Sequence, residues 1–244
     1  MTAMQESQRK LRKPKAKSKE GFTCGFCNKT FMKESTYLVH LCERKRRWID
    51  RDTKHAKVGF MVFQKFYEVS YGAARKPKTV DEFIKSNLYT AFMSFGRYIV
   101  NNNVINPSDF IMFVIKSGVP LKNWESPVLY EKYVRELNKK ETPYAAVERH
   151  FLLVKQWSID TGEEMYDFFR KISPAQATMW IQTGRISPWV LFNCESANDM
   201  IGRLSEEQLD LIYSYIDPEF WKIKFKMNEG DANIVREELK AFGM

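Results

Sequence analysis

Apolar residues recur every three or four positions along most of the chain, and this spacing predicts amphipathic helices. Beyond residue 76, the apolar segments are separated by short turns that contain proline or glycine. Runs of alternating apolar and polar residues, which would predict strands, are confined to residues 21–42. The pattern therefore predicts a mostly α protein.

Several of the predicted helices begin at residues suited to capping. Two segments have the capping-box pattern, a Ser or Thr followed three residues later by Glu or Gln. Two others have a serine directly before a proline, which is typical of an N-cap and the first helical position. The predicted N-caps are Thr79, Ser173, Ser187 and Ser205.

The composition changes along the chain and indicates four parts. Residues 1–20 are rich in basic residues and poor in large apolar ones, which predicts a disordered basic arm. Residues 21–47 hold a compact cluster of cysteines and aromatics. Residues 48–75 are predicted to form a connecting helix and a linker, and residues 76–244 a helical domain.

The positive charge is concentrated at one end of the molecule. The net charge is +9, but residues 1–58 hold 16 Lys/Arg and 6 Asp/Glu, whereas the rest holds 23 and 24. Such asymmetry indicates a polyanionic partner, with nucleic acid first and an anionic membrane second. The alternative is a basic tail that only keeps the protein soluble.

Three classes of protein are excluded by the sequence. No run of 18 apolar residues is present, which argues against a membrane-spanning helix. No apolar stretch follows the N-terminal charges, so a secretory signal is not expected. Four cysteines, three of them close together, fit a metal site in a reducing compartment better than a disulfide scaffold. We therefore expect a cytoplasmic protein.

The most specific chemical signal is the spacing of Cys24, Cys27 and His40. The two cysteines are separated by two residues, and twelve residues follow before the histidine. This part of the chain resembles the classical zinc-finger family, in which two thiolates and an imidazole contribute to a tetrahedral zinc site. Phe31 and Tyr37 occupy core positions of that family. The resemblance implies a small ββα zinc-finger-like module, followed here by the multi-helix domain.

The fourth zinc ligand departs from the family pattern, since Arg and Lys occupy the positions where a second histidine is expected. Cys42 is the favoured ligand. Residues two apart on a regular helix point about 200° apart, so Cys42 can bind only if the helix ends near His40. His55 is the second choice, and a three-ligand site completed by water is the third.

Binding to nucleic acid is expected to occur mainly through phosphates. The surface positions of the predicted finger helix are Met32, Lys33, Ser35, Thr36 and Val39, a poor set for reading bases. Cations that precede and follow the finger are better suited to backbone binding, and DNA is favoured over RNA. The predicted phosphate contacts are Lys33, Arg44, Lys45, Arg46, Arg47 and Arg51.

Two other functions stay open. The finger could instead dock a protein of the replication or transcription machinery, and residues 76–244 could bind a protein partner or a second copy. No phosphate-binding glycine loop, G-x-S-x-G or H-E-x-x-H motif is present, so an enzyme is not expected. Scattered carboxylates nevertheless leave a metal-dependent nuclease as the second alternative.

Two segments, His40–Trp48 and Thr183–Trp189, resemble parts of an uncharacterised family of zinc-finger proteins from tailed phages (myoviruses). The resemblance implies a role in the cytoplasm of an infected bacterium, in phage DNA replication, recombination, packaging or transcription. It also favours Cys42 as the fourth ligand, because the sequence His-Leu-Cys belongs to the first segment.

Overall fold

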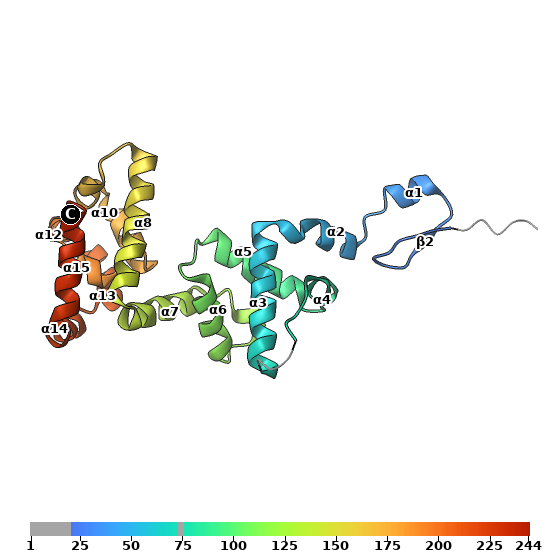
Figure 1. Ribbon diagram of the computed structural model, residues 1–244, viewed down its shortest axis with the longest axis horizontal. Coiled ribbons are helices and arrows are strands. Elements are labelled where there is room, and N and C mark those ends of the chain that lie inside the picture. Colours follow the sequence, from blue (N-terminus) through green and yellow to red (C-terminus); the bar gives the residue numbers. More distant parts are fainter. Residues whose placement is uncertain (1–20, 73–75) are drawn as a thin grey trace, which may run out of the picture. The chain divides into compact units, whose positions relative to one another are not determined.

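A computed structural model of the chain describes residues 21–72 and 76–244 (Figure 1). It divides into two compact units, one ending at Asp52 and one beginning at Thr53. Its described residues contain fifteen α-helices and one two-stranded sheet. The predicted class, a small ββα module followed by a multi-helix region, is therefore confirmed. The predicted basic arm, residues 1–20, and residues 73–75 of the predicted linker lie outside the described residues.

The first unit begins with a short antiparallel hairpin. Phe22 pairs with Phe31, and the Tyr37 ring stacks on Phe22 with the ring centroids 5.8 Å apart. Such a small unit buries too little apolar surface to be stable by packing alone. Its elements are β1 Phe22–Thr23, β2 Thr30–Phe31, α1 Glu34–Leu38, α2 Glu43–Ile49 and the 3₁₀ helix η1 Asp50–Asp52.

The second unit is built from helices with short connections. Its first helices are α3 Lys54–Tyr71, α4 Val80–Lys85, α5 Tyr89–Asn101, α6 Pro107–Lys116, η2 Leu121–Asn123 and α7 Pro127–Lys140. They are followed by α8 Pro143–Thr161, η3 Met165–Asp167, α9 Phe168–Lys171, α10 Pro174–Gln182 and α11 Pro188–Leu191. The last are α12 Glu195–Ile201, α13 Glu206–Ile216, α14 Pro218–Met227 and α15 Glu229–Ala241.

Helix α3, expected as a connector, packs closely on α5 within the second unit. A Cβ atom added at Gly96 would lie 2.7 Å from the backbone nitrogen of Gly59, so the two backbones are in direct contact there. The apolar face of α3 is buried by this packing at Val62 and Phe63. The observed boundary between units consequently lies before α3.

The core of the second unit is rich in aromatic rings. Trp189 packs edge-on against Trp221, and Phe168 stacks on Trp180. Aromatic pairs of this kind bury large areas and add specific contact geometry. No helix in the described part of the chain has both the length and the apolar character needed to cross a bilayer.

The predicted helix starts are confirmed. Thr79 and Ser205 form complete capping boxes with Glu82 and Gln208. The side chains of the serines at 173 and 187 accept backbone N–H groups, and a proline opens each helix that follows. These caps satisfy N–H groups that have no partner within the first helical turn.

Candidate metal centre

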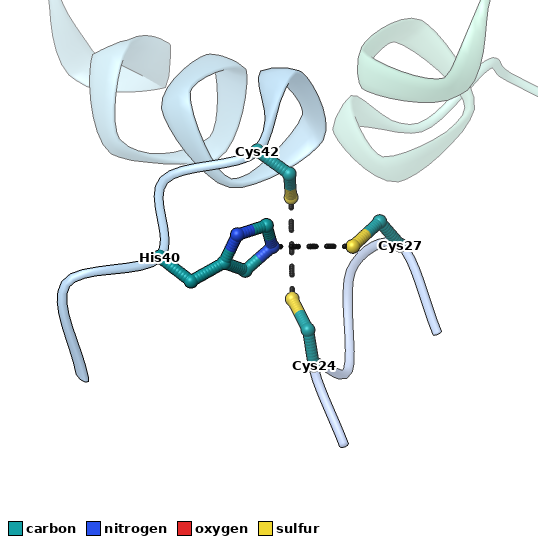
Figure 2. A group of neighbouring side chains, drawn as sticks. All are labelled: Cys24, Cys27, His40 and Cys42. Carbon is teal, nitrogen blue, oxygen red and sulfur yellow. Dashed lines mark hydrogen bonds between the residues drawn. The ribbon is translucent and has the colours of Figure 1, made fainter. Parts of the chain in front are cut away.

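Four side chains from two separate segments of the first unit point toward one another (Figure 2). Cys24 and Cys27 lie in the turn between the two strands, and His40 and Cys42 lie in the segment between α1 and α2. Their ligand atoms all lie within 4.8 Å of one another. The three ligands predicted from spacing and the favoured fourth ligand are thus brought together.

The turn that carries the first two cysteines is held by backbone hydrogen bonds. The Asn28 N–H donates to the carbonyl of Cys24 at 2.8 Å, and the Cys24 N–H donates to the carbonyl of Lys29 at 2.9 Å. Asn28 has a φ of 58°, a left-handed conformation that asparagine tolerates better than most residues. This closed turn directs both thiols to the same side.

Cys42 reaches the cluster because the helix ends before His40. Helix α1 stops at Leu38, and the Cys42 backbone is extended, with φ −74° and ψ 162°. The condition for ligation by Cys42, that the helix ends near His40, is therefore met. Cys42 is also the N-cap of α2, and its Sγ accepts the backbone N–H of Lys45 at 3.4 Å.

The distances within the cluster fit a tetrahedral zinc site. The Sγ atoms of Cys24 and Cys42 are 4.0 Å apart, and Cys27 Sγ is 3.3 Å from His40 Nε2. Ligands at normal zinc distances form tetrahedral edges of about 3.5–3.8 Å. Three thiols and one imidazole also form a complete set, which is typical of structural zinc and leaves no position for a substrate.

The surroundings of Cys24 favour metal binding, and those of His40 contact its ring. Backbone N–H groups of Phe26 and Cys27 lower the pKa of the Cys24 thiol, which favours the thiolate that a metal needs. The Cys24 side chain is buried. The centroid of the Phe31 ring lies 4.6 Å from that of His40, with the rings tilted by 45°, so the imidazole is in contact with the small core.

The alternative ligand His55 has a different environment. It lies in the first turn of α3, in the second unit, and its Nε2 is 3.2 Å from Oδ1 of Asn101. The residues within reach of one ion in the described chain are Cys24, Cys27, His40 and Cys42. The geometry thus supports Cys42 as the fourth ligand. His55 instead makes a contact between α3 and α5.

Two of the predicted phosphate-binding cations hold the ligand segments. Nη1 of Arg44 donates to the carbonyl of Phe26, between the first two cysteines, at 3.4 Å. Nζ of Lys45 donates to the carbonyl of His40 at 3.2 Å. Sequence reasoning missed this structural role. The available signal was the position of these two residues, two and three residues after Cys42.

Two further predicted cations are paired with carboxylates. Arg47 forms an ion pair with Glu43, one turn earlier in α2. Nη2 of Arg51 lies 3.3 Å from Oδ2 of Asp52. The guanidinium carbon of Arg51 lies over the Trp48 ring, 4.3 Å from its centroid. The exposed ring of Trp48 therefore has a cationic neighbour within its own unit.

The last two predicted cations, Lys33 and Arg46, are exposed. Around Lys33, the surface of α1 and its flanks mixes exposed polar residues with exposed apolar ones: Met32 and Leu38 are each 67% exposed, and Val39 is 81% exposed. This confirms the exposed positions expected for the finger helix. None of these positions holds an Arg, Asn or Gln, which make the bidentate contacts that distinguish bases, and Lys33 is the one cation among them.

Comparison of the chain with protein-family models, with curated proteins and with solved structures finds no match. The geometry of the cluster and the charges around it are therefore the basis for assigning a function.

Proposed function

We propose that this chain is a zinc-containing accessory protein that binds nucleic acid, DNA in particular, mainly through phosphates. The observation that carries the proposal is the double role of Cys42, which lies in the ligand cluster and also caps α2. A zinc ion would therefore fix the start of the helix that carries Arg44, Lys45, Arg46 and Arg47. Metal binding and the display of positive charge are linked through one side chain.

The electrostatics of the unit agree with this proposal. Three thiolates and one Zn²⁺ carry a net charge of −1, and the side chains of Arg44 and Lys45 lie beside the ligand segments. Arg46 and Lys33 are exposed and point to solvent. Each cation that neutralises a phosphate releases condensed counterions, so the affinity should fall steeply with salt.

Phosphate binding is favoured over base reading because of the residues that α1 presents. The helix has five residues, and its exposed flank carries Leu38 and Val39. Reading of bases needs donors and acceptors such as Arg, Asn or Gln at the groove edge. We therefore expect little sequence preference.

The proposal is tested by the binding of labelled duplex and single-stranded DNA at about 50 and 200 mM salt. Replacing both Lys33 and Arg46 by alanine should weaken binding about tenfold while bound zinc stays at one equivalent. These two residues are chosen because Arg44 and Lys45 also support the metal ligands. Lys132→Ala together with Lys222→Ala, two exposed lysines of the second unit, is the matched control.

Removal of zinc provides the second arm of this test. Chelation should weaken binding and added zinc should restore it, because the ion that would fix Cys42 at the start of α2 is removed. The absence of binding to DNA or RNA at low salt by the zinc-loaded protein would refute the proposal.

A second candidate, a protein-docking adaptor, is favoured by the apolar surface of the first unit. Met32, Leu38 and Val39 are the most exposed of its large apolar side chains. Exposed apolar groups that lie together often mark protein interfaces. Replacing Leu38 and Val39 by serine should leave DNA affinity unchanged under the first function and abolish partner binding under the second.

The proposed role includes no catalytic step, since the four-ligand set leaves no open position on the metal. The resemblance to tailed-phage proteins would place this role in an infected bacterial cytoplasm. Incubation of zinc-loaded protein and DNA with magnesium or manganese tests the nuclease alternative, and cleavage that a chelator abolishes would support it.

A further inference from the structure

The outer face of helix α8 carries a row of apolar side chains that remain in solvent. Tyr144, Leu152 and Ile159 are 66%, 64% and 67% exposed. At about 100° per residue, these three side chains lie within an arc of about 80° that also contains Glu148 and Lys155. We call these five residues the α8 stripe. The opposite face of the helix is buried in the core.

The α8 stripe, except Ile159, forms one wall of an apolar groove of about 600 Å³. The other wall is α15, through Ile234, Glu238 and Phe242, and Met165 also lines the groove. Figure 1 shows α8, in yellow, beside α15, in red, and the two helices are in contact. The groove thus runs along a helix pair, an arrangement that commonly accepts the side chains of a further helix.

The order of residues in the stripe is self-complementary. Along α8 it reads apolar, acidic, apolar, basic, apolar, and the outer apolar pair and the charged pair are each centred on the same midpoint. A two-fold axis between Phe151 and Leu152 would place Tyr144 opposite Ile159 of a second copy. The same axis would place Glu148 opposite Lys155 of the second copy, twice in each dimer. Such isologous pairing is the rule in symmetric dimers.

The two charges of the stripe have no ion-pair partner among the described residues. They are separated by two helical turns, about 10 Å, so they cannot pair with each other on the same helix. The ion pair that α8 does form uses Arg149, which reaches Glu141 at 2.7 Å. Charge complementarity is therefore available to a partner that runs antiparallel to α8.

We propose that the α8 stripe is the interface of a homodimer, in which a second copy of this chain packs its α8 antiparallel against the first. The apolar residues supply burial, and the two Glu148–Lys155 pairs set the direction and register. An unrelated amphipathic helix could fill the groove, but it would have no need of this symmetric charge order. The inference is independent of the metal and of nucleic acid.

The test is the oligomeric state of the full chain, measured by sedimentation equilibrium up to about 100 µM. The unmodified protein should be in concentration-dependent equilibrium with a dimer. Glu148→Lys alone, or Lys155→Glu alone, sets like charges opposite each other and should weaken the dimer at least about tenfold. The double variant Glu148→Lys with Lys155→Glu restores opposite charges and should return the affinity to within about threefold of the original.

Matched variants elsewhere separate the interface from general effects of charge and hydrophobicity. Lys132→Glu, on the exposed surface of α7, should leave the dimer unchanged. Leu152→Asp should abolish it, whereas Leu211→Asp, at a side chain 54% exposed on α13, should not. The proposal is overturned by a protein that is monomeric at all concentrations, by single reversals without effect, or by a double variant that does not recover.

Discussion

Cys42 combines two structural roles in one side chain. It belongs to the ligand cluster, and its sulfur accepts the N–H of Lys45 at the start of α2. A helix N-terminus stabilises a thiolate, because the unpaired N–H groups there carry partial positive charge. The same thiolate thus benefits from the metal and from the helix, and its loss should affect both.

Replacement of Cys42 by serine is therefore expected to remove stable zinc binding, whereas His55→Ala should retain one equivalent. With three ligands remaining, zinc affinity should fall by at least about 100-fold. Metal analysis of the purified variants measures the stoichiometry, and cobalt substitution reports the number of thiolate ligands by its absorption. Loss of metal in the His55 variant with retention in the Cys42 variant would reverse the assignment of the fourth ligand.

A buried histidine makes the stability of the second unit depend on pH. His150 is fully buried, stacks on Phe169 and packs edge-on against Phe168. Neither ring nitrogen has a hydrogen-bond partner in the described residues. Burial, with a smaller contribution from Arg149, lowers the pKa of His150 to about 3. The folded state therefore excludes the proton, whereas the unfolded chain binds it near pH 6.5.

The sign of this effect follows from the two pKa values. Above about pH 6.5 the histidine is neutral in both states, and as the pH falls the unfolded state gains the proton first. The loss of stability should reach about 2 kcal/mol at pH 5. His150→Phe should flatten this part of the pH dependence, as measured by urea unfolding of both proteins with tryptophan fluorescence. Equal slopes of the free energy of unfolding against pH for the two proteins would contradict the prediction. Because both proteins have the same metal site, its contribution cancels in the comparison.

At the scale of elements, the contact between α3 and α5 depends on the absence of side chains. A Cβ at Gly96 would lie 2.7 Å from Gly59 N and 2.8 Å from the carbonyl oxygen of His55, both backbone atoms that cannot move aside. Gly96→Ala should therefore destabilise the second unit by about 2 kcal/mol. Gly230→Ala in α15, where a Cβ meets nothing within 4 Å, should instead stabilise by about 0.5–1 kcal/mol. Urea unfolding of the two variants measures the contrast, and a neutral Gly96 variant would contradict it.

The helix starts could be predicted from the sequence because capping is a local interaction. Thr79 and Ser205 reach N–H groups only three residues away, so the signal lies within one helical turn. The packing of α3 on α5 could not be predicted in this way, because the contact joins Gly59 and Gly96 across a turn and a further helix. The end of α1 at Leu38 could not be predicted either, because the apolar pattern continues through it. From the sequence it was only a condition that ligation by Cys42 requires.

At the scale of the molecule, the two units differ in charge. Residues 1–52 hold 14 Lys/Arg and 6 Asp/Glu, a net charge of +8, whereas residues 53–244 hold 25 and 24, a net charge of +1. Attraction to a polyanion should therefore depend on the first unit and its N-terminal residues. Since residues 1–20 contribute seven of these basic residues, they should affect the salt dependence of binding more than the specificity.

Deletion of residues 1–20 is therefore expected to lower the DNA affinity and to reduce the salt dependence of binding, with zinc content unchanged. Each lost phosphate contact should reduce the slope of log affinity against log salt by about 0.9. Fluorescence anisotropy at four salt concentrations measures the slope for the full and shortened chains. The double variant Glu148→Lys with Lys155→Glu, whose net charge is that of the parent, is the control and should give the parental slope. An unchanged slope after deletion would show that the basic N-terminal residues make no phosphate contacts and that binding depends on the rest of the first unit.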